Sequence, residues 1–144
     1  MRLNYDVFVH YFVPLVERMK GQDGGGLIAH TNSLAGYLGL PSQGPYSAAK
    51  AAARIFMDAA RVELAPHGIR AITICPGFVA AGSGDDAGVP RPFEISAEAA
   101  AREIVRAMTR EVAQADFPRP TSAAVRFARA LPRRLRERAL GRLF

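Results

Sequence analysis

The sequence of 144 residues lacks the features that mark secreted, membrane-spanning and metal-binding chains: it has one cysteine, and its apolar runs are short. Cys75 cannot form a disulfide within the chain, and its place in the apolar run AITICPG predicts a buried structural thiol. No stretch approaches the roughly 20 uninterrupted apolar residues that span a bilayer. We therefore expect a cytoplasmic protein without a transmembrane helix, and we predict no metal site.

Positive charge is concentrated at one end of the chain. Residues 1–118 carry 11 Lys and Arg against 12 Asp and Glu, whereas residues 119–144 carry eight Arg against Glu137 alone. The net charge of +6 therefore belongs to the tail, and any argument for a polyanion or a membrane as partner concerns the tail only. This contrast divides the chain into a nearly neutral body and a basic tail.

Helical and strand-like patterns alternate along the chain. Apolar residues at three- and four-residue spacings predict a helix over 3–20, and Pro14 is expected to kink or break it. The other expected elements are strands at 27–33, 69–77 and 112–117, helices at 45–65 and 96–110, and two short helices within 121–143 separated at Pro132. Strands that alternate with helices of this length predict an α/β fold with a parallel sheet covered by helices.

Three features with chemical potential fall near one edge of the predicted sheet. Tyr46 and Lys50 lie four residues apart on a helix, so their side chains share one face. Ser33 ends the strand before that helix, and Pro76-Gly77 ends the next strand. Ligands of open α/β sheets bind at the carboxyl ends of the strands. A Tyr/Lys pair alone is common by chance, but its placement beside two strand ends indicates a site.

The motifs that carry these residues resemble the pattern of the classical short-chain dehydrogenase/reductase family. The segments S-L-A-G (33–36), Y-S-A-A-K (46–50) and GIRAITICPG (68–77) match that pattern, with its serine-to-tyrosine spacing of 13. Asn4, 29 residues before the serine, matches the asparagine of the family's preceding helix. The resemblance covers essentially the whole chain.

This resemblance places the chain in the second half of the family's fold. It implies a partial Rossmann-type, doubly wound parallel sheet that holds the last three strands with their flanking helices. The Gly-rich phosphate turn and the residue that selects NAD or NADP would precede Met1, so we expect the nucleotide-binding strands to be absent. Residues 1–118 are then the C-terminal catalytic half, and residues 119–144 are a basic amphipathic helical tail.

The resemblance also implies a role for each motif residue. Tyr46 is the general acid in carbonyl reduction or the base in alcohol oxidation, and Lys50 beside it favours the ionised phenol and binds the nicotinamide ribose. Ser33 holds the substrate oxygen, and Asn4 supports a water-mediated proton relay behind Lys50. The residues expected to bind the cofactor are Tyr46, Lys50, Pro76, Gly77 and Val79.

The implied activity is hydride transfer between NAD or NADP and a small-molecule alcohol or ketone. The sequence names neither the substrate nor the cofactor of choice, and we expect weak cofactor binding without the first half of the fold. Ala81 replaces a threonine that contacts the nicotinamide in many members of the family. The glycine-rich segment 82–88 is interpreted as a short substrate loop.

Two accounts of the short chain stay open. In one, the chain is truncated or its start is misassigned, and the working protein is longer. In the other, the chain is complete and covers the free edge of its first strand by self-association or with a separate nucleotide-binding chain. We expect a homo-oligomer. The alternative to an enzyme is a non-catalytic fragment that acts by association with a full-length relative or a membrane surface.

The basic tail supports two interpretations. Such a helix can lie on an anionic membrane surface, or it can cap the substrate pocket or a dimer surface with its arginines in solvent. Nucleic-acid binding is not expected, because the tail has few aromatic residues for base stacking. The apolar residues that recur every four positions, interrupted at Pro132, are Phe127, Leu131, Leu135, Ala139 and Leu143.

Overall fold

The computed structural model describes residues 1–80 and 91–143. Ala81 and the segment 82–88 lie outside the described residues, so the predictions made for them stay predictions. Three short helices are η1 (Arg2–Asp6), η2 (Leu34–Tyr37) and η3 (Ala65–His67). The longer elements are α1 (Val7–Lys20), β1 (Gly26–Thr31), α2 (Gly44–Leu64), β2 (Ile69–Pro76), α3 (Ala97–Arg110), β3 (Gln114–Phe117), α4 (Arg119–Ala130) and α5 (Arg133–Leu143).

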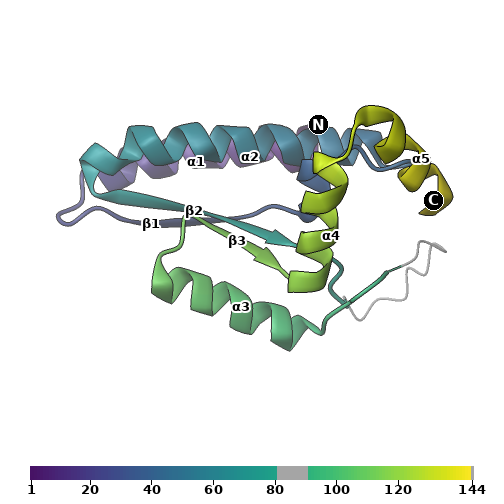
Figure 1. Ribbon diagram of the computed structural model, residues 1–144. Helices are drawn as coiled ribbons and strands as arrows, with labels where there is room; N and C mark the ends of the chain where they lie inside the picture. The colour runs from purple at the N-terminus through teal and green to yellow at the C-terminus, as the bar shows by residue number, and fades with distance from the viewer. Residues whose placement is uncertain (81–90, 144) are drawn as a thin grey trace.

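The described strands form one parallel sheet in the order β1-β2-β3. Gly26 of β1 is in register with Ile69 of β2, and Thr73 of β2 with Gln114 of β3. Helices α1 and α2 cover one face of the sheet and α3 covers the other, while α4 crosses the carboxyl ends of the strands (Figure 1). This arrangement confirms the predicted α/β fold with a partial, doubly wound parallel sheet.

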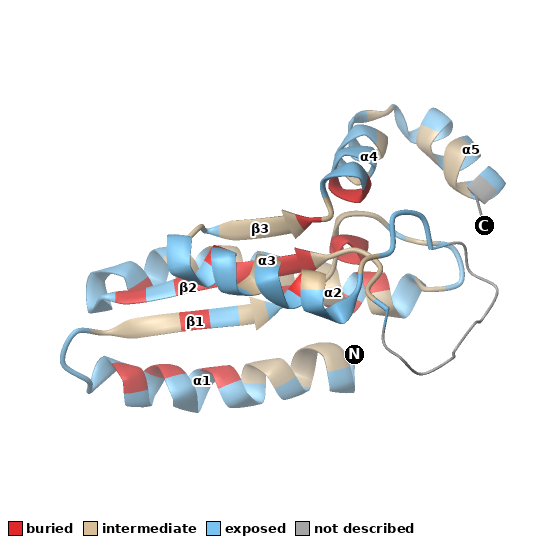
Figure 2. Ribbon diagram, turned by 90° about the horizontal axis from the view of Figure 1, so that it is seen from below, coloured by how far each residue is buried: buried red, intermediate tan, exposed pale blue. Residues whose placement is uncertain are grey.

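The core lies on both faces of the central strand β2, which is the most buried element. Buried side chains are concentrated on this strand and on the inner sides of α1 and α2 (Figure 2). The cluster under α1 and α2 contains Phe12, Val16, Met19, Ile28, Met57, Ala60, Leu64, Ile69 and Ala71. The cluster under α3 contains Ile72, Ile74, Ala100, Ala107 and Phe117.

The first helix differs from the prediction at both its start and its middle. Residues Arg2–Asp6 form a π-helical segment, and α1 then continues through Pro14 without a break. Pro14 and His10 are both exposed, so the carbonyl group that loses its helical partner at this proline can be hydrated. The predicted break is therefore wrong: α1 runs on through Pro14, where the carbonyl group without a helical partner is exposed.

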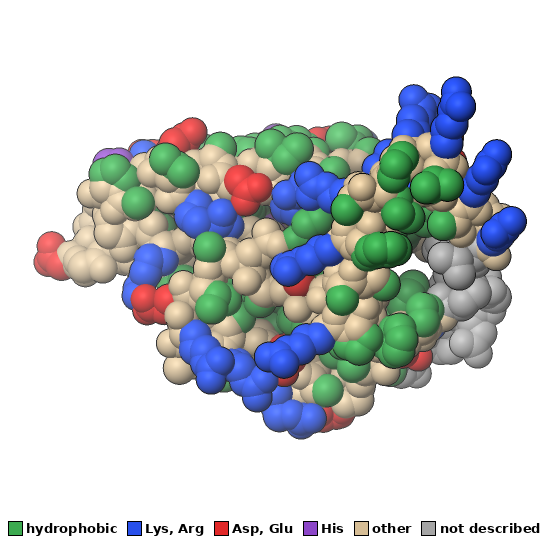
Figure 3. Space-filling model, viewed as in Figure 1, with side chains coloured by type: hydrophobic (Ala, Val, Ile, Leu, Met, Phe, Trp, Pro, Cys, Tyr) green, Lys and Arg blue, Asp and Glu red, His purple; other side chains and the backbone are tan. Residues whose placement is uncertain are grey.

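The tail forms two helices, α4 and α5, that separate at Pro132 as predicted. Helix α4 contacts β3 and η2, and α5 contacts α4. No residue of α5 with a described side chain is buried, and its basic side chains point away from the body of the protein (Figure 3). None of the helices among the described residues is both long and apolar enough to cross a bilayer.

Candidate active site

Tyr46 and Lys50 lie in the first two turns of α2, which begins at Gly44 with a proline in its first turn. Proline favours this position because its fixed φ suits a helix and its missing N–H would be unpaired there. The Lys50 ammonium lies 5.6 Å from the centroid of the Tyr46 ring. The two side chains therefore share one face of the helix, as their spacing predicts.

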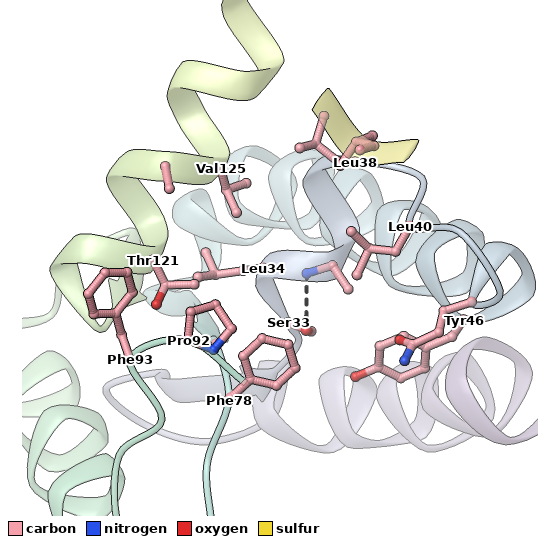
Figure 4. A pocket seen from close by; sticks show the side chains of 15 residues that line it. Ser33, Leu34, Leu38, Leu40, Tyr46, Phe78, Pro92, Phe93, Thr121 and Val125 are labelled. Carbon is pink, nitrogen blue, oxygen red and sulfur yellow. Dashed lines mark hydrogen bonds between the residues drawn. The ribbon is translucent and has the colours of Figure 1, made fainter. Parts of the chain in front are cut away.

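Ser33 follows β1 and caps the short helix η2. Its Oγ accepts a hydrogen bond from the backbone N–H of Ala35 at 3.1 Å. Because this bond uses a lone pair of the hydroxyl, the Ser33 proton is left to donate elsewhere. The hydroxyl of Tyr46 points toward Ser33 across the same cavity (Figure 4). Two hydroxyl groups thus face one space from two different elements.

Asn32 holds this arrangement together, and the sequence analysis did not identify it. Its buried side chain donates from Nδ2 to the carbonyl of Lys50 at 3.1 Å and accepts from the backbone N–H of Ser33 at 2.8 Å. Its own N–H donates to the carbonyl of Ile74 on β2. Asn32 therefore ties Ser33, helix α2 and the central strand β2 together. The sequence does contain a signal for Asn32, because it is a polar residue at the end of a predicted buried strand.

Gly36 allows η2 to lie directly against α2. A Cβ atom at this position would come within 3.0 Å of the carbonyl carbon and oxygen of Lys50. This is tighter than nine in ten real Cβ contacts, so a side chain here would require η2 and α2 to move apart by a few tenths of an ångström. The last glycine of the S-L-A-G motif therefore sets the distance between Ser33 and the helix that carries Tyr46.

Lys50 is half-buried between α2 and the end of β1. Its Nζ lies 3.5 Å from the carbonyl oxygen of Thr31, a long hydrogen bond that leaves the other two ammonium protons without a partner among the described residues. Burial lowers the pKa of Lys50 from its ordinary value, because the charged form loses hydration. The two ammonium protons without a partner in the described chain can donate to a ligand beside Tyr46.

His30 is a second titratable group under α1 and α2, and the sequence analysis gave it no role. Its ring packs against Phe8 with centroids 4.0 Å apart, and its buried Nε2 has no hydrogen-bond partner. Burial, followed by the charge of Lys50, lowers the pKa of His30 to about 4. The imidazole is therefore neutral in the folded protein at neutral pH.

This neutral histidine predicts acid destabilisation. Since the pKa of His30 is about 4 in the fold and 6.5 ordinarily, its stabilising contribution is complete above pH 6.5 and is lost as the pH falls toward 4. We expect the loss to be about 2 kcal/mol, allowing for partial exposure. Urea unfolding of wild type and His30→Phe at several pH values measures it.

The exposed His67 provides the matched control for this measurement. The His67→Gln variant should lose stability with falling pH as steeply as the wild type, whereas His30→Phe should give a shallower curve. Equal slopes for wild type and His30→Phe between pH 7 and 4.5 would contradict the assignment of the buried neutral imidazole.

A cavity of about 350 Å³ opens beside the two hydroxyl groups. This volume lies at the lower end of the range of about 300–1,000 Å³ that is usual for small-molecule sites. The floor comes from the β1–α2 connection and the end of β2, and α4 and α5 supply the far wall (Figure 4). The lining residues are Ser33, Leu34, Ala35, Leu38, Leu40, Gln43, Tyr46, Gly77, Phe78, Pro92, Phe93, Thr121, Ala124, Val125 and Leu140.

The tail contributes to this cavity with residues other than the predicted apolar series. Thr121 and Val125 of α4 and Leu140 of α5 line it, whereas Phe127 and Leu135 of the predicted series are exposed. The break at Pro132 separates the two helices, so a four-residue repeat counted across it does not lie on one face. Of the two interpretations, the lining residues agree with a cap over the pocket.

A polar network outside the cavity joins η2 to β3 and α4. The Tyr37 hydroxyl of η2 donates to the carboxylate of Asp116 at 3.0 Å, and Gln114 donates to both groups. Arg126 of α4 pairs with Asp116 at 2.7 Å, and the Asp116 side chain is only 4% exposed. Burial, above all, raises the pKa of Tyr37, so its hydroxyl keeps its proton. The network therefore fixes α4 against η2.

Of the remaining predicted site residues, only Gly77 lines the described wall of the cavity that the two hydroxyl groups face. Asn4 is in η1, which packs against α2, but no hydrogen bond joins its side chain to Lys50 among the described residues. Pro76 pairs with β3, and Val79 packs in the core under α3. Of the predicted residues after β2, Gly77 lines the cavity, and its neighbour Phe78, which the sequence analysis missed, lines it too.

Cys75 is fully buried within β2. Burial, assisted by the nearby carboxylate of Asp116, raises the pKa of its thiol to about 12. A thiol that holds its proton at neutral pH is a poor nucleophile. The structure therefore agrees with the prediction of a structural cysteine.

Comparison with known proteins places this geometry in a family. Residues 1–88 match the family model described as short chain dehydrogenase. An uncharacterized oxidoreductase of Myxococcus xanthus is 33% identical over 129 residues, which are 90% of this chain and 49% of that protein. A cyclopentanol dehydrogenase of Comamonas is 40% identical over 55 residues, which are 38% of this chain and 22% of that protein.

A solved structure has the same fold over nearly the whole chain. It is a short chain dehydrogenase from Burkholderia cenocepacia in complex with NADP, with a TM-score of 0.78 and 26% identity. The superposition covers 94% of this chain and 55% of that one. This chain thus spans about half the length of the proteins that it matches over most of its own length.

Proposed function

Because the chain belongs to the short-chain dehydrogenase family, we propose that it carries the catalytic centre of an NAD(P)-dependent oxidoreductase acting on an alcohol or ketone. One observation carries the proposal: the hydroxyl groups of Ser33 and Tyr46 face one largely apolar cavity, with the Lys50 ammonium 5.6 Å from the centroid of the tyrosine ring. Such an arrangement can hold a carbonyl oxygen and protonate it.

The protein residues perform the following steps in carbonyl reduction. Ser33 donates its free proton in a hydrogen bond to the substrate oxygen, which stabilises the negative charge that develops there. Tyr46 transfers its phenolic proton to the same oxygen, and the cation of Lys50 stabilises the phenolate that is left. NAD(P)H, when bound, would supply the hydride to the carbonyl carbon. The apolar walls keep water from the reacting carbon.

The donor set near Lys50 fits the nicotinamide end of such a cofactor. The half-buried ammonium has protons available for ribose hydroxyl groups, and Gly77 places backbone without a side chain at the edge of the cavity. We propose Tyr46, Lys50, Pro76, Gly77 and Val79 as the border of the nicotinamide, and Asn4 as a support for proton relay behind Lys50. Residues that would bind the adenine end are not proposed within this chain.

The wider assignment follows the same reasoning. We propose that residues 1–118 are the catalytic half and residues 119–144 a basic cap whose inner side closes the cavity, in a cytoplasmic protein. Self-association is part of the proposal, because η1, α1 and α2 expose large apolar side chains. These include Leu3, Tyr11, Val13, Ile55 and Val62, whose exposed fractions lie between 52% and 87%. Nothing in the described residues favours the membrane contact or the non-catalytic alternative.

Binding of the nicotinamide end alone tests the proposal. We expect reduced nicotinamide mononucleotide to bind weakly, with a dissociation constant above about 100 μM, and Lys50→Met to weaken that binding by about tenfold through loss of a charged hydrogen bond. Lys20→Met is the matched control, since Lys20 pairs with Glu17 on the surface. Titration followed by NMR measures both.

An assay of ketone reduction completes this test. The protein with NADPH or NADH should reduce a cyclic ketone, which loss of the dihydronicotinamide absorbance reports. A wild-type protein that neither binds the mononucleotide nor reduces any ketone would contradict the proposed function. Equal binding by Lys50→Met and Lys20→Met would remove Lys50 from the cofactor site.

A further inference from the structure

The cavity is polar at two separated places. Most of its wall is aliphatic, aromatic or proline, and the polar side chains that line it are those of Ser33, Gln43, Tyr46 and Thr121. The first three lie on the connection that leads into α2 and on that helix itself. Thr121 lies on α4, beside Phe93 and Pro92 and away from Tyr46 (Figure 4). The wall therefore has one further polar side chain, remote from the reacting hydroxyl groups.

Thr121 is buried, yet its hydroxyl has no hydrogen-bond partner. The residue is 9% exposed, and its Oγ1 contacts neither solvent nor any donor or acceptor in the described chain. Its neighbour Ser122 shows what the first turn of α4 offers, because the Ser122 hydroxyl donates to the carbonyl of Arg119 at 3.0 Å. The backbone could satisfy a hydroxyl here, and that of Thr121 is left unpaired.

The methyl group of Thr121 explains its orientation. A Cβ atom added to Gly77 would lie 3.2 Å from this methyl carbon, so the methyl packs against the end of β2. With Cγ2 directed there, the hydroxyl is directed toward the Pro92–Phe93 end of the cavity (Figure 4). A buried polar group without a partner is destabilising, so its presence in a native structure requires an explanation.

We infer that the Thr121 hydroxyl is a second polar anchor for the substrate, which is an apolar ketone or alcohol carrying another oxygen at a distance from its reacting carbon. This inference rests on the proposed function, because Ser33 and Tyr46 define the reacting end. The substrate skeleton fills the apolar space between the two ends. Thr121 determines specificity, and it takes no part in the proton or hydride transfer.

A matched ligand series tests the inference. The probes are decalone, an apolar bicyclic ketone, and a panel of hydroxydecalones that differ in the carbon carrying the hydroxyl. We expect at least one hydroxydecalone to bind the wild-type protein about tenfold more tightly than decalone, because it satisfies the buried hydroxyl. The Thr121→Val variant, which has the same shape, should lose this preference. NMR titration with NADPH present measures it.

Two further variants separate binding from structure. Thr121→Ser keeps the hydroxyl and should retain the preference. Ser122→Ala removes a hydroxyl that is already paired, and it should leave the preference unchanged. Thr121→Val should also raise the melting temperature of the ligand-free protein by a few degrees, because it removes an unpaired buried group. Higher stability combined with loss of the hydroxyl preference is not expected of a merely structural residue.

The possible outcomes distinguish the inference from the proposed function. Reduction of decalone and hydroxydecalones at equal efficiency by wild type and Thr121→Val would overturn the inference and leave the proposed function standing. A hydroxyl preference in binding that disappears in Thr121→Val, without any turnover, would support the inference and count against the proposed reaction. Failure of every probe to bind the wild-type protein would overturn both.

Discussion

Replacing Tyr46 by phenylalanine is expected to lower ketone reduction by about 10²- to 10⁴-fold, the usual contribution of a positioned general acid. The ring remains, so the wall of the cavity keeps its shape and substrate binding should change little. The loss should therefore fall on kcat and leave KM nearly constant, because the proton is transferred only in the transition state. Steady-state kinetics with a saturating dihydronicotinamide measures this division.

Tyr11→Phe is the matched control for this substitution. Tyr11 is 76% exposed on α1 and does not line the cavity, so loss of its hydroxyl should leave both constants unchanged. A Tyr46→Phe variant that reduced ketones at the wild-type rate would show that another group supplies the proton. The only other hydroxyl groups that line the described cavity wall are those of Ser33 and Thr121, and both are much weaker acids than a phenol.

Much of this site could be predicted because its residues lie close together in the sequence. The strand before Ser33 and the strand that ends at Pro76 are short apolar runs, and the helix that carries Tyr46 and Lys50 is an alanine-rich segment. Parallel strands bring their carboxyl ends to one edge of the sheet, so the meeting of these motifs follows from topology alone. The motifs and their spacing therefore predict both the α/β fold and the sheet edge at which Ser33 and Tyr46 meet.

The far wall of the cavity depends on contacts that no short pattern encodes. Thr121 and Val125 reach the cavity because the network around Asp116 fixes α4 against η2, and Asp116 pairs with groups up to 79 residues away in sequence. The four-residue repeat in the tail was misleading, since it was counted across the break at Pro132. The role of His30 was hidden for a similar reason, because its burial arises from α1 and α2 packing over β1.

Removing the Ser33 hydroxyl is expected to have the other large effect. Ser33→Ala loses the donor to the substrate oxygen, and the rate of reduction should fall by about 10²- to 10³-fold, as at other sites that stabilise a developing oxyanion. The same substitution also removes the hydrogen bond that caps η2, at a cost of about 1 kcal/mol in stability. A loss of activity in this variant alone is therefore ambiguous.

Ser33→Asp separates these two effects. An aspartate can accept the hydrogen bond from Ala35 and keep the cap, but at neutral pH it has no proton to donate to a substrate oxygen. We expect it to unfold at nearly the wild-type denaturant concentration and to be at least as inactive as Ser33→Ala, while Ser33→Thr retains both properties. Aspartate at this position shares with the native serine the capping acceptor but not the proton. A Ser33→Asp variant with substantial activity would therefore mean that Ser33 only shapes η2.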